Sequence, residues 1–320
     1  MTSITPGPVD LPTSCEVVET PLGTFACPSD AFADHLRDLG GHQRPDIASM
    51  AALVAPGDLV LDVGGFIGTV AVPLARAVGP TGRVVSFEAM PDHVRMLRHN
   101  LAANGVADRA EVVHTLISPH RGRVSAHRLA LSAATTWYEV DTAAPAAETP
   151  DTAGASVDGA DVAVGTTTVD AWLAGRPDLA ELPVSLLKVD VEGMELDVLR
   201  GAEQLLARHH PALQVEVARY QLRRHGADLP DLQQFLTAHG YRCYLNLTAR
   251  DTATDTFTLG RLADLRLLGD MLTDVLAVHR DSPRSPGSPR WLTTQATVLR
   301  HRGTPLARRV AGRARRALHR

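Results

Sequence analysis

One run of the sequence, KVDVEGME at residues 188–195, combines a lysine with acidic residues at a spacing that suits proton-transfer chemistry. In an extended strand alternate residues share a face, so Lys188 and Asp190 project from the same side while the valines beside them project from the other. A lysine inside such an apolar strand needs a charged partner, and Asp190 or Glu192 is the nearest. A carboxylate held in this way can take the proton of a hydroxyl group, so Lys188, Asp190 and Glu192 are candidate catalytic residues.

The acidic residues that follow Asp190 also have a structural interpretation. Carboxylates near the start of a helix complement its dipole, and we expect one of Glu192 and Glu195 to have only this role. Two histidines are further candidate bases: His42 follows a pair of glycines, and His114 lies near the end of a strand. An ordinary polar role is the alternative for both histidines.

A divalent cation is a further expectation at this edge of the sheet. Glu216 ends the strand that follows the 188–195 run along the chain. Asp190 and Glu216 could jointly hold a hard cation such as Mg²⁺, with water or substrate oxygens as the remaining ligands. No other ligands are evident in the sequence, so a site without metal is the alternative.

A second run, LDVGGFIG at residues 61–68, ends another apolar strand in closely spaced glycines. Glycines at this point allow a tight turn and let a ligand approach the start of the next helix. Their spacing does not match the dinucleotide fingerprint, and Asp62 before them would repel a phosphate. Glu88, at the end of the next strand, is placed to accept hydrogen bonds from ribose hydroxyls.

These features indicate a ligand that is a nucleoside carrying positive charge instead of phosphate. S-adenosylmethionine is the obvious candidate. The alternative is a plain strand–turn–helix connection with an acidic surface residue.

The elements that position these runs alternate between strands and helices. Apolar, β-branched segments predict strands at 58–65, 83–89, 110–118, 184–191, 212–217 and 241–247. Helical periodicity predicts helices at 66–79, 91–105, 193–210 and 229–240. Such alternation implies an α/β fold with a doubly wound, mostly parallel sheet, whose ligands lie at the carboxyl ends of the strands. Segments 256–260 and 273–279 would add an antiparallel edge.

The chain is predicted to have three parts. Residues 1–55 form an N-terminal extension with a hairpin at 16–28 and two helices, and residues 56–280 form the central domain. Within that domain, 121–140 is predicted to be an added hairpin, and the alanine-rich, acidic segment 141–164 a flexible insertion. Residues 281–320 form a Ser/Pro/Arg-rich tail with a net charge of +9.

Composition excludes several classes of protein. The chain has 320 residues, of which 44% are hydrophobic and 21% charged, as in ordinary globular proteins. No apolar run is long enough to span a membrane, and the N-terminus lacks the pattern of a secretory signal. Three scattered cysteines favour a reduced, cytoplasmic location. An acidic body with a basic tail does not indicate a nucleic-acid-binding domain. Lys188 is the sole lysine, which excludes a P-loop and a protein kinase.

The chain resembles the FkbM family of S-adenosylmethionine-dependent methyltransferases over about residues 18–279. The resemblance rests on LDVGGFIG (61–68), FEAMP (87–91), the paired asparagines Asn100 and Asn104, TTTVDAWL (166–173), KVDVEGMELDVLRGAEQLL (188–206) and LQVEV (213–217). Three places differ from the usual family pattern: the glycine loop carries Phe66-Ile67, Ala89 stands where proline is usual, and Arg44-Pro45 replaces Glu-Pro.

The resemblance implies a seven-stranded Rossmann-like sheet with S-adenosylmethionine as the methyl donor. It implies donor contacts from Asp62, Gly64, Gly65, Phe66, Gly68, Glu88, Ala89 and Ser118. It also implies O-methylation of a hydroxyl on a sugar, polyketide or other secondary metabolite, with Asp190 or Glu192 as the base and Lys188 holding the carboxylates in place.

Two other classes of function stay open from the sequence. The enzyme could methylate an amine or a carboxylate, or the chain could be a non-catalytic nucleoside-binding scaffold with the same fold. The expected partner is a small-molecule acceptor, without nucleic acid, and a homo-oligomer is compatible with the sequence.

Overall fold

The computed structural model describes residues 11–29, 31–119, 123–128, 136–141, 162–282 and 284. The predicted insertion 141–164 and the predicted tail 281–320 lie almost wholly outside them. Within the described residues, no helix has both the length and the apolar character needed to cross a membrane.

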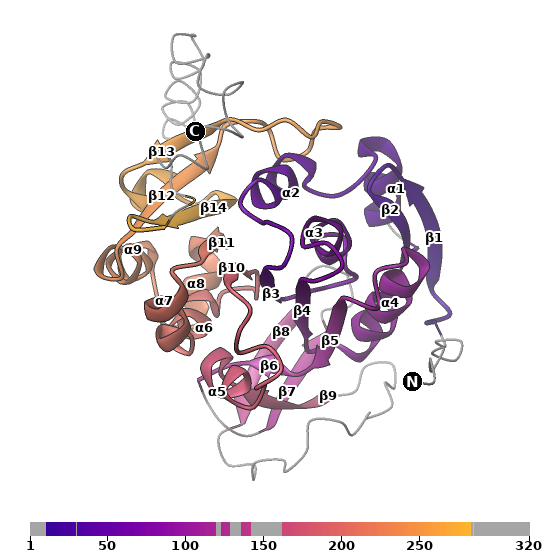
Figure 1. The fold of residues 1–320 in the computed structure, drawn as a ribbon, viewed down its shortest axis with the longest axis horizontal. Coiled ribbons are helices and arrows are strands. Elements are labelled where there is room, and N and C mark those ends of the chain that lie inside the picture. Colours follow the sequence, from indigo (N-terminus) through magenta and orange to yellow (C-terminus); the bar gives the residue numbers. More distant parts are fainter. Residues whose placement is uncertain are drawn as a thin grey trace.

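The central sheet has eight strands in the order β13-β12-β14-β11-β10-β3-β4-β5 (Figure 1). Their bounds are β3 Leu59–Val63, β4 Arg83–Glu88, β5 Ala110–His114, β10 Val184–Val189, β11 Ala212–Ala218, β12 Tyr241–Asn246, β13 Leu259–Leu262 and β14 Leu272–His279. The five strands from β11 to β5 are parallel, and β14, β12 and β13 add an antiparallel edge. The predicted doubly wound α/β fold is confirmed. The eighth strand is the short β13 on the outer edge of β12.

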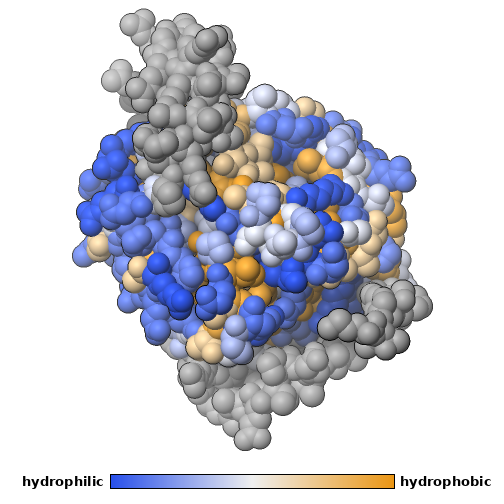
Figure 2. Space-filling view, in the orientation of Figure 1, coloured by the Kyte–Doolittle hydropathy of each residue, from blue (hydrophilic) through white to orange (hydrophobic). Residues whose placement is uncertain are grey.

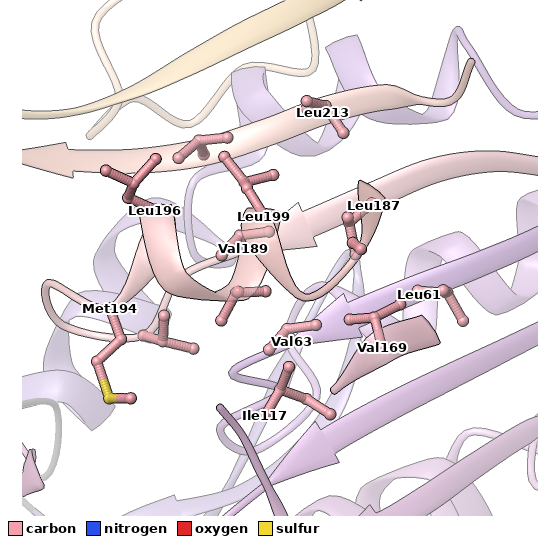
Figure 3. Close-up of a cluster of buried hydrophobic side chains, with 14 of the residues drawn as sticks. Leu61, Val63, Ile117, Val169, Leu187, Val189, Met194, Leu196, Leu199 and Leu213 are labelled. Carbon is pink, nitrogen blue, oxygen red and sulfur yellow. The ribbon is translucent and has the colours of Figure 1, made fainter. Parts of the chain in front are cut away.

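Helices cover both faces of this sheet, with α2, α3 and α4 on one side and α5, α6, α7 and α9 on the other (Figure 1). Their bounds are α1 Ala31–Leu39, α2 Arg44–Ala51, α3 Ala71–Ala77, α4 Pro91–Ala103, α5 Val169–Ala174, α6 Glu195–Arg200, α7 Glu203–His209, α8 Arg219–Arg224, α9 Leu229–Ala238 and the 3₁₀ helix η1 Leu265–Leu268. The side chains of β3 alternate between two cores: Leu61 and Val63 face α6, whereas Val60 faces α3. Figure 3 shows the α6 core, with Leu196 and Leu199 against the sheet.

Two predicted helices differ from the observed ones. The helix predicted at 66–79 begins only at Ala71, because Phe66 and Gly68 have positive φ angles of 48° and 88° that a right-handed helix does not allow. The helix predicted at 193–210 is divided into α6 and α7 at Gly201. The delayed start of α3 leaves residues 64–69 as an irregular loop beside the ends of the strands.

The N-terminal hairpin is confirmed and forms a separate two-stranded sheet of β1 Cys15–Thr20 and β2 Gly23–Pro28. Its apolar face, with Val18 and Phe25, is buried in the same core as α3 and α4. A third sheet combines β6 Leu116–Ile117, β9 Val162–Thr167, β7 Arg123–Arg128 and β8 Thr136–Asp141. The hairpin predicted at 121–140 is therefore confirmed as β7–β8, whereas the strand predicted at 110–118 is divided at Thr115 between the central sheet and this third sheet.

Candidate active site

A cavity of about 450 Å³ lies at the carboxyl ends of β3, β4, β10 and β11, the edge at which doubly wound sheets place ligands. Its volume is in the range of small-molecule sites.

The wall has two halves of different character. The first, called the loop half, consists of residues 63–66, 69–70, 87–89, His93 and 115–117. The second, called the carboxyl half, consists of Lys188, residues 190–192, Glu216, Tyr220, Gln221, residues 250–251 and Leu272. Phe32, His42 and Gln43 of the N-terminal extension complete the wall. In the view of Figure 2, hydrophobic residues reach the surface near the middle of the molecule among hydrophilic ones.

The irregular loop of residues 64–69, called the glycine loop, lies between the ends of β4 and β10. The backbone N–H groups of Gly64 and Gly65 both donate to the carbonyl of Phe87, at 3.0 Å each. Gly64 has a φ angle of 83°, and a Cβ atom there would lie 1.8 Å from the carbonyl oxygen of Asp190. No other residue can occupy this position without moving the end of β10, so the close approach explains the glycine.

Glu88 is the charged group of the loop half, and backbone N–H groups hold it. Its Oε2 accepts from the N–H of Phe66 and its Oε1 from the N–H of Met90, both at 2.8 Å, and His93 Nδ1 lies 3.5 Å from Oε1. Burial alone would raise the pKa of Glu88, but these hydrogen bonds bring it below its usual value. Glu88 is therefore ionised, and its Oε2, which accepts from Phe66, keeps a lone pair for a hydroxyl group in the cavity.

The structure divides the predicted donor-binding residues into two groups. Gly64, Gly65, Phe66, Glu88 and Ala89 lie in the wall of the cavity. The other three, Asp62, Gly68 and Ser118, are not in the wall.

Each residue of the second group has a structural environment of its own. Gly68 packs so closely that a Cβ atom would lie 2.5 Å from Leu97 Cδ1. Ser118 is buried, and its N–H donates to the carbonyl of Thr167. Asp62 is fully buried below the loop, where Lys188 Nζ lies 3.2 Å from Oδ1 and Ser86 Oγ donates to Oδ2 at 3.0 Å.

Lys188 connects the two halves. Its Nζ donates to the carbonyl of Gly64 at 2.8 Å and lies 3.4 Å from Asp190 Oδ2 and 3.2 Å from Asp62 Oδ1. Burial alone would lower the pKa of Lys188, but Asp190 and Asp62 raise it above its usual value. Lys188 thus stays protonated, with one hydrogen bond to the carbonyl of Gly64 and two carboxylates beside it, and the sequence predicts such a charged partner for a lysine in this apolar strand.

Asp190 and Glu216 form a carboxyl pair in the carboxyl half. Burial opposes ionisation of both groups. At Asp190 the positive charges of Lys188 and Arg250 outweigh burial and lower the pKa, whereas at Glu216 burial and the charge of Asp190 raise the pKa well above its usual value. Of the two carboxyl groups, Asp190 therefore ionises first and Glu216 keeps its proton to higher pH.

The side chains around this pair do not fit the Mg²⁺ ion that was expected there. Lys188 and Arg250 already supply positive charge, with Arg250 Nη2 located 3.4 Å from Glu216 Oε1. Across the described ranges of the chain, no group of three or more His, Cys, Asp or Glu side chains is arranged to hold a metal.

Glu192 and Glu195 have different environments. Glu192 lies in the cavity wall with a φ angle of 57°, and Gln221 Nε2 donates to its Oε2. Burial, Asp190 and Glu195 raise the pKa of Glu192 to about 8. Glu195 is buried outside the wall, and its Oε1 accepts from the N–H groups of Val191 and Gly193 at 3.2 and 3.0 Å. Glu195 thus stabilises the turn before α6, which is the structural role expected for one of the two.

Several residues of the wall were not singled out from the sequence. Arg250 comes from the connection between β12 and β13, and Tyr220 and Gln221 come from the unpredicted helix α8. No local motif marks these positions, because only the tertiary fold brings them to the cavity.

The two candidate histidines differ in position. His42 lies in the wall, where burial and the nearby charge of Arg250 lower its pKa to about 3. His114 is outside the wall, with Nε2 3.1 Å from the carbonyl oxygen of Ala89. His42 is therefore neutral at pH 7 and a weak base.

Comparison with known proteins identifies one family. The model of the methyltransferase FkbM domain matches residues 62–243, more than half of the chain. The match begins in β3 and ends in β12, so it includes both the glycine loop and the carboxyl pair.

Individual relatives are more distant. Catechol O-methyltransferase of Mycobacterium tuberculosis is 50% identical over 54 residues, which is 17% of this chain and 24% of that protein. This chain thus matches about a quarter of that relative's length. The O-methyltransferase TomG of Streptomyces achromogenes, solved with SAM, has 15% identity over 74% of this chain and 79% of its own, with a TM-score of 0.41. An O-methyltransferase of Bacillus cereus, solved with SAH, has 15% identity over 79% of this chain and 92% of its own, with a TM-score of 0.41.

Proposed function

The chain belongs to the FkbM methyltransferase family and carries an S-adenosylmethionine-dependent methyltransferase domain, and from this premise we propose that the protein methylates a hydroxyl oxygen of a small acceptor, a secondary metabolite or sugar. The observation that carries the proposal is that the loop half, which suits a nucleoside, and the carboxyl half, which is rich in proton-accepting groups, line the same cavity. Methyl transfer to a hydroxyl needs both in one place.

The residues of the loop half suit S-adenosylmethionine. Glu88 Oε2 offers a free lone pair to a ribose hydroxyl, and Leu116 and Ile117 give an apolar wall for the adenine ring. The ionised carboxylates of Glu88 and Asp190 favour a ligand that carries positive charge over one that carries phosphate. When bound, S-adenosylmethionine supplies an electrophilic methyl group on a positively charged sulfur.

Glu192 is the base in this proposal. An alcohol is a poor nucleophile until its proton is removed, and a base works best when its pKa is near the working pH. Glu192 fits this requirement, because its pKa of about 8 makes it a stronger proton acceptor than Asp190, whose pKa is lowered. Gln221 holds the carboxylate of Glu192 in the wall of the cavity.

Asp190 and Lys188 position the acceptor. The ionised Asp190 accepts a hydrogen bond from the acceptor hydroxyl, and Lys188 fixes Asp190 relative to the glycine loop through its contacts with Gly64 and Asp190. Since Lys188 is bonded to both halves, it sets the distance between the donor loop and the acceptor group, and such positioning is a large part of catalysis in a displacement reaction.

The proposal is tested by incubating the protein with donor labelled at the methyl group and a panel of polyols, phenols, amines and carboxylic acids. O-methylation predicts labelled ethers and S-adenosylhomocysteine in equal amounts, with a rate that rises with pH up to about 8. Labelled amines or esters would replace the proposal by N- or carboxyl-methylation. Donor binding without product from any acceptor class would favour the non-catalytic scaffold. The cytoplasmic location and the oligomeric state stay predictions.

A further inference from the structure

Two asparagines of α4 attach the N-terminal hairpin to the domain. In the described part of the chain the hairpin pairs with no strand of the central sheet. Instead, Asn104 Oδ1 accepts from the N–H of Thr24 at 3.0 Å and Nδ2 donates to its carbonyl at 2.7 Å. Likewise, Asn100 Oδ1 accepts from the N–H of Ala26 at 2.7 Å, and its Nδ2 donates to the carbonyl of Ala26 at 2.9 Å. The two amides, one helical turn apart, thus pair with alternate residues of β2 as a neighbouring strand would.

Of the two, Asn100 alone also contacts the glycine loop. Its Nδ2 donates a second hydrogen bond to the carbonyl of Ile67 at 2.8 Å. The second bond of Asn104 Nδ2 goes to the carbonyl of Asn100 in its own helix, at 2.8 Å. Because Asn100 is fully buried, one amide group without access to water joins the hairpin to the loop.

The loop needs such support at Phe66. A φ angle of 48° is unfavourable for a bulky residue such as phenylalanine. Such a conformation persists only where the surroundings determine it. Glu88 binds the N–H of Phe66, and Asn100 binds the carbonyl of the next residue, Ile67. The loop is therefore held on both sides of the strained residue.

The ring of Phe66 extends this support to the wall of the cavity. It packs edge-on against Phe32 of α1 and against His93 of α4, with ring centres 5.2 and 4.6 Å apart. Phe32 belongs to α1, the helix that comes after the hairpin in the chain, and both phenylalanines lie in the wall. The hairpin, the loop and this side of the wall are consequently one packed unit.

We propose that Asn100 is a positioning residue for the methyl donor, which fixes the hairpin and the glycine loop relative to each other and so maintains the Phe32–Phe66 wall of the donor site. The N-terminal extension is then a part of the donor site, and not merely a cover over the domain. The inference rests on the proposed donor, and Asn104 is its internal control because it makes the same hairpin contacts without touching the loop.

The test compares Asn100→Ala with Asn104→Ala by calorimetric titration with S-adenosylhomocysteine and by steady-state kinetics. Asn100→Ala should raise Kd and the donor KM about tenfold, as expected for the loss of a buried hydrogen bond, with kcat at saturating donor unchanged within about threefold. Asn104→Ala should leave Kd within about twofold, although both variants should melt at a lower temperature. Equal Kd values in the two variants would overturn the inference.

Two further measurements keep the inference testable on its own. If Asn100→Ala does not fold, Asn100→Ser is compared with Asn104→Ser in the same way, because serine keeps one hydrogen-bond donor. Amide hydrogen exchange without ligand should be faster at residues 64–68 in the Asn100 variant than in the Asn104 variant, and equal rates would refute the coupling. Wild-type protein that binds no S-adenosylhomocysteine would instead refute the proposed function, while the exchange comparison still decides the role of Asn100.

Discussion

The two halves of the cavity hold their charged groups by different means. In the loop half, His93 and the backbone N–H groups of Met90 and Phe66 hold the Glu88 carboxylate and lower its pKa against the effect of burial. In the carboxyl half, side chains neutralise one another: Lys188 and Arg250 lower the pKa of Asp190, whereas the pKa values of Glu192 and Glu216 are raised. The first arrangement suits a ligand that is always the same, and the second suits proton transfer, because its groups can change their protonation state near neutral pH.

If this division is correct, changes in the carboxyl half should affect turnover, and changes in the loop half should affect donor binding. The largest effect is expected for Asp190→Ala, which removes the ionised carboxylate that orients the acceptor hydroxyl. We expect kcat to fall at least about 1000-fold, while Kd for S-adenosylhomocysteine changes less than about threefold. Asp197→Ala, which removes an acidic residue paired with Arg200 on α6, is the control and should behave as wild type. Near-normal turnover of Asp190→Ala would remove this residue from the site.

The next largest effect concerns Glu192, the proposed base. Its pKa of about 8 means that the ionised, proton-accepting form increases as the pH rises to 8. Wild-type kcat/KM should therefore rise with pH and level off above 8. Glu192→Gln should lower kcat/KM about 100-fold and abolish this dependence. A variant that keeps the pH dependence would show that another group accepts the proton. Glu195→Gln is the control: it should keep a pH dependence, displaced to lower pH because the charge of Glu195 no longer raises the pKa of Glu192.

A smaller effect, and on a different quantity, is expected for Glu88→Gln. Glutamine has one acceptor oxygen, so its NH₂ group would face the N–H of either Phe66 or Met90. We expect Kd for the donor to rise about 30-fold, with kcat at saturating donor within about threefold of wild type. Titration calorimetry and initial rates measure the two quantities. Unchanged Kd together with reduced kcat would contradict the division between the halves.

The smallest effect on activity is expected for Glu195→Gln, which tests the structural role of this residue. The folded-state pKa of Glu195 is raised from 4.5 to about 7, mainly by burial. The folded protein thus binds this proton more tightly than the unfolded chain. The corresponding stability is complete below pH 4.5 and is lost as the pH rises to about 7.

Glutamine keeps the acceptor oxygen for Val191 and Gly193 but cannot ionise. Urea unfolding at pH 8.5 should therefore show the variant to be more stable than wild type, by up to about 3 kcal/mol, and the difference should shrink at pH 5. A variant that is less stable at both pH values would mean that the carboxylate form is needed in the fold.

The sequence predicts features that depend on local patterns, but not those that depend on the tertiary fold. The strands of the central sheet, the hairpin and the place of Glu88 at a strand end follow from local patterns, because apolar runs and turn residues depend on neighbours in the chain. The run from Lys188 to Glu192 was recognisable for the same reason. Arg250 and Gln221 reach the cavity only through the tertiary fold, so no local pattern identifies them.

Asp62 has a structural role that local reasoning did not predict, and its contact with the donor stays a prediction. Its spacing before the glycines suggested contact with a charged ligand, but the alternation along β3 places it on the face of the sheet that bears Lys188 and Ser86. There it neutralises the lysine below the loop. The late start of α3 has a similar origin, since the positive φ angle of Phe66 depends on Glu88 and Asn100, which are distant in the sequence.

A crystal structure of the protein with S-adenosylhomocysteine would test the central claim most directly. We predict the nucleoside against the glycine loop, with its ribose hydroxyls on Glu88 and its sulfur directed toward Asp190. A nucleoside bound away from Glu88, or a dinucleotide that occupies the same cavity in its place, would contradict the account.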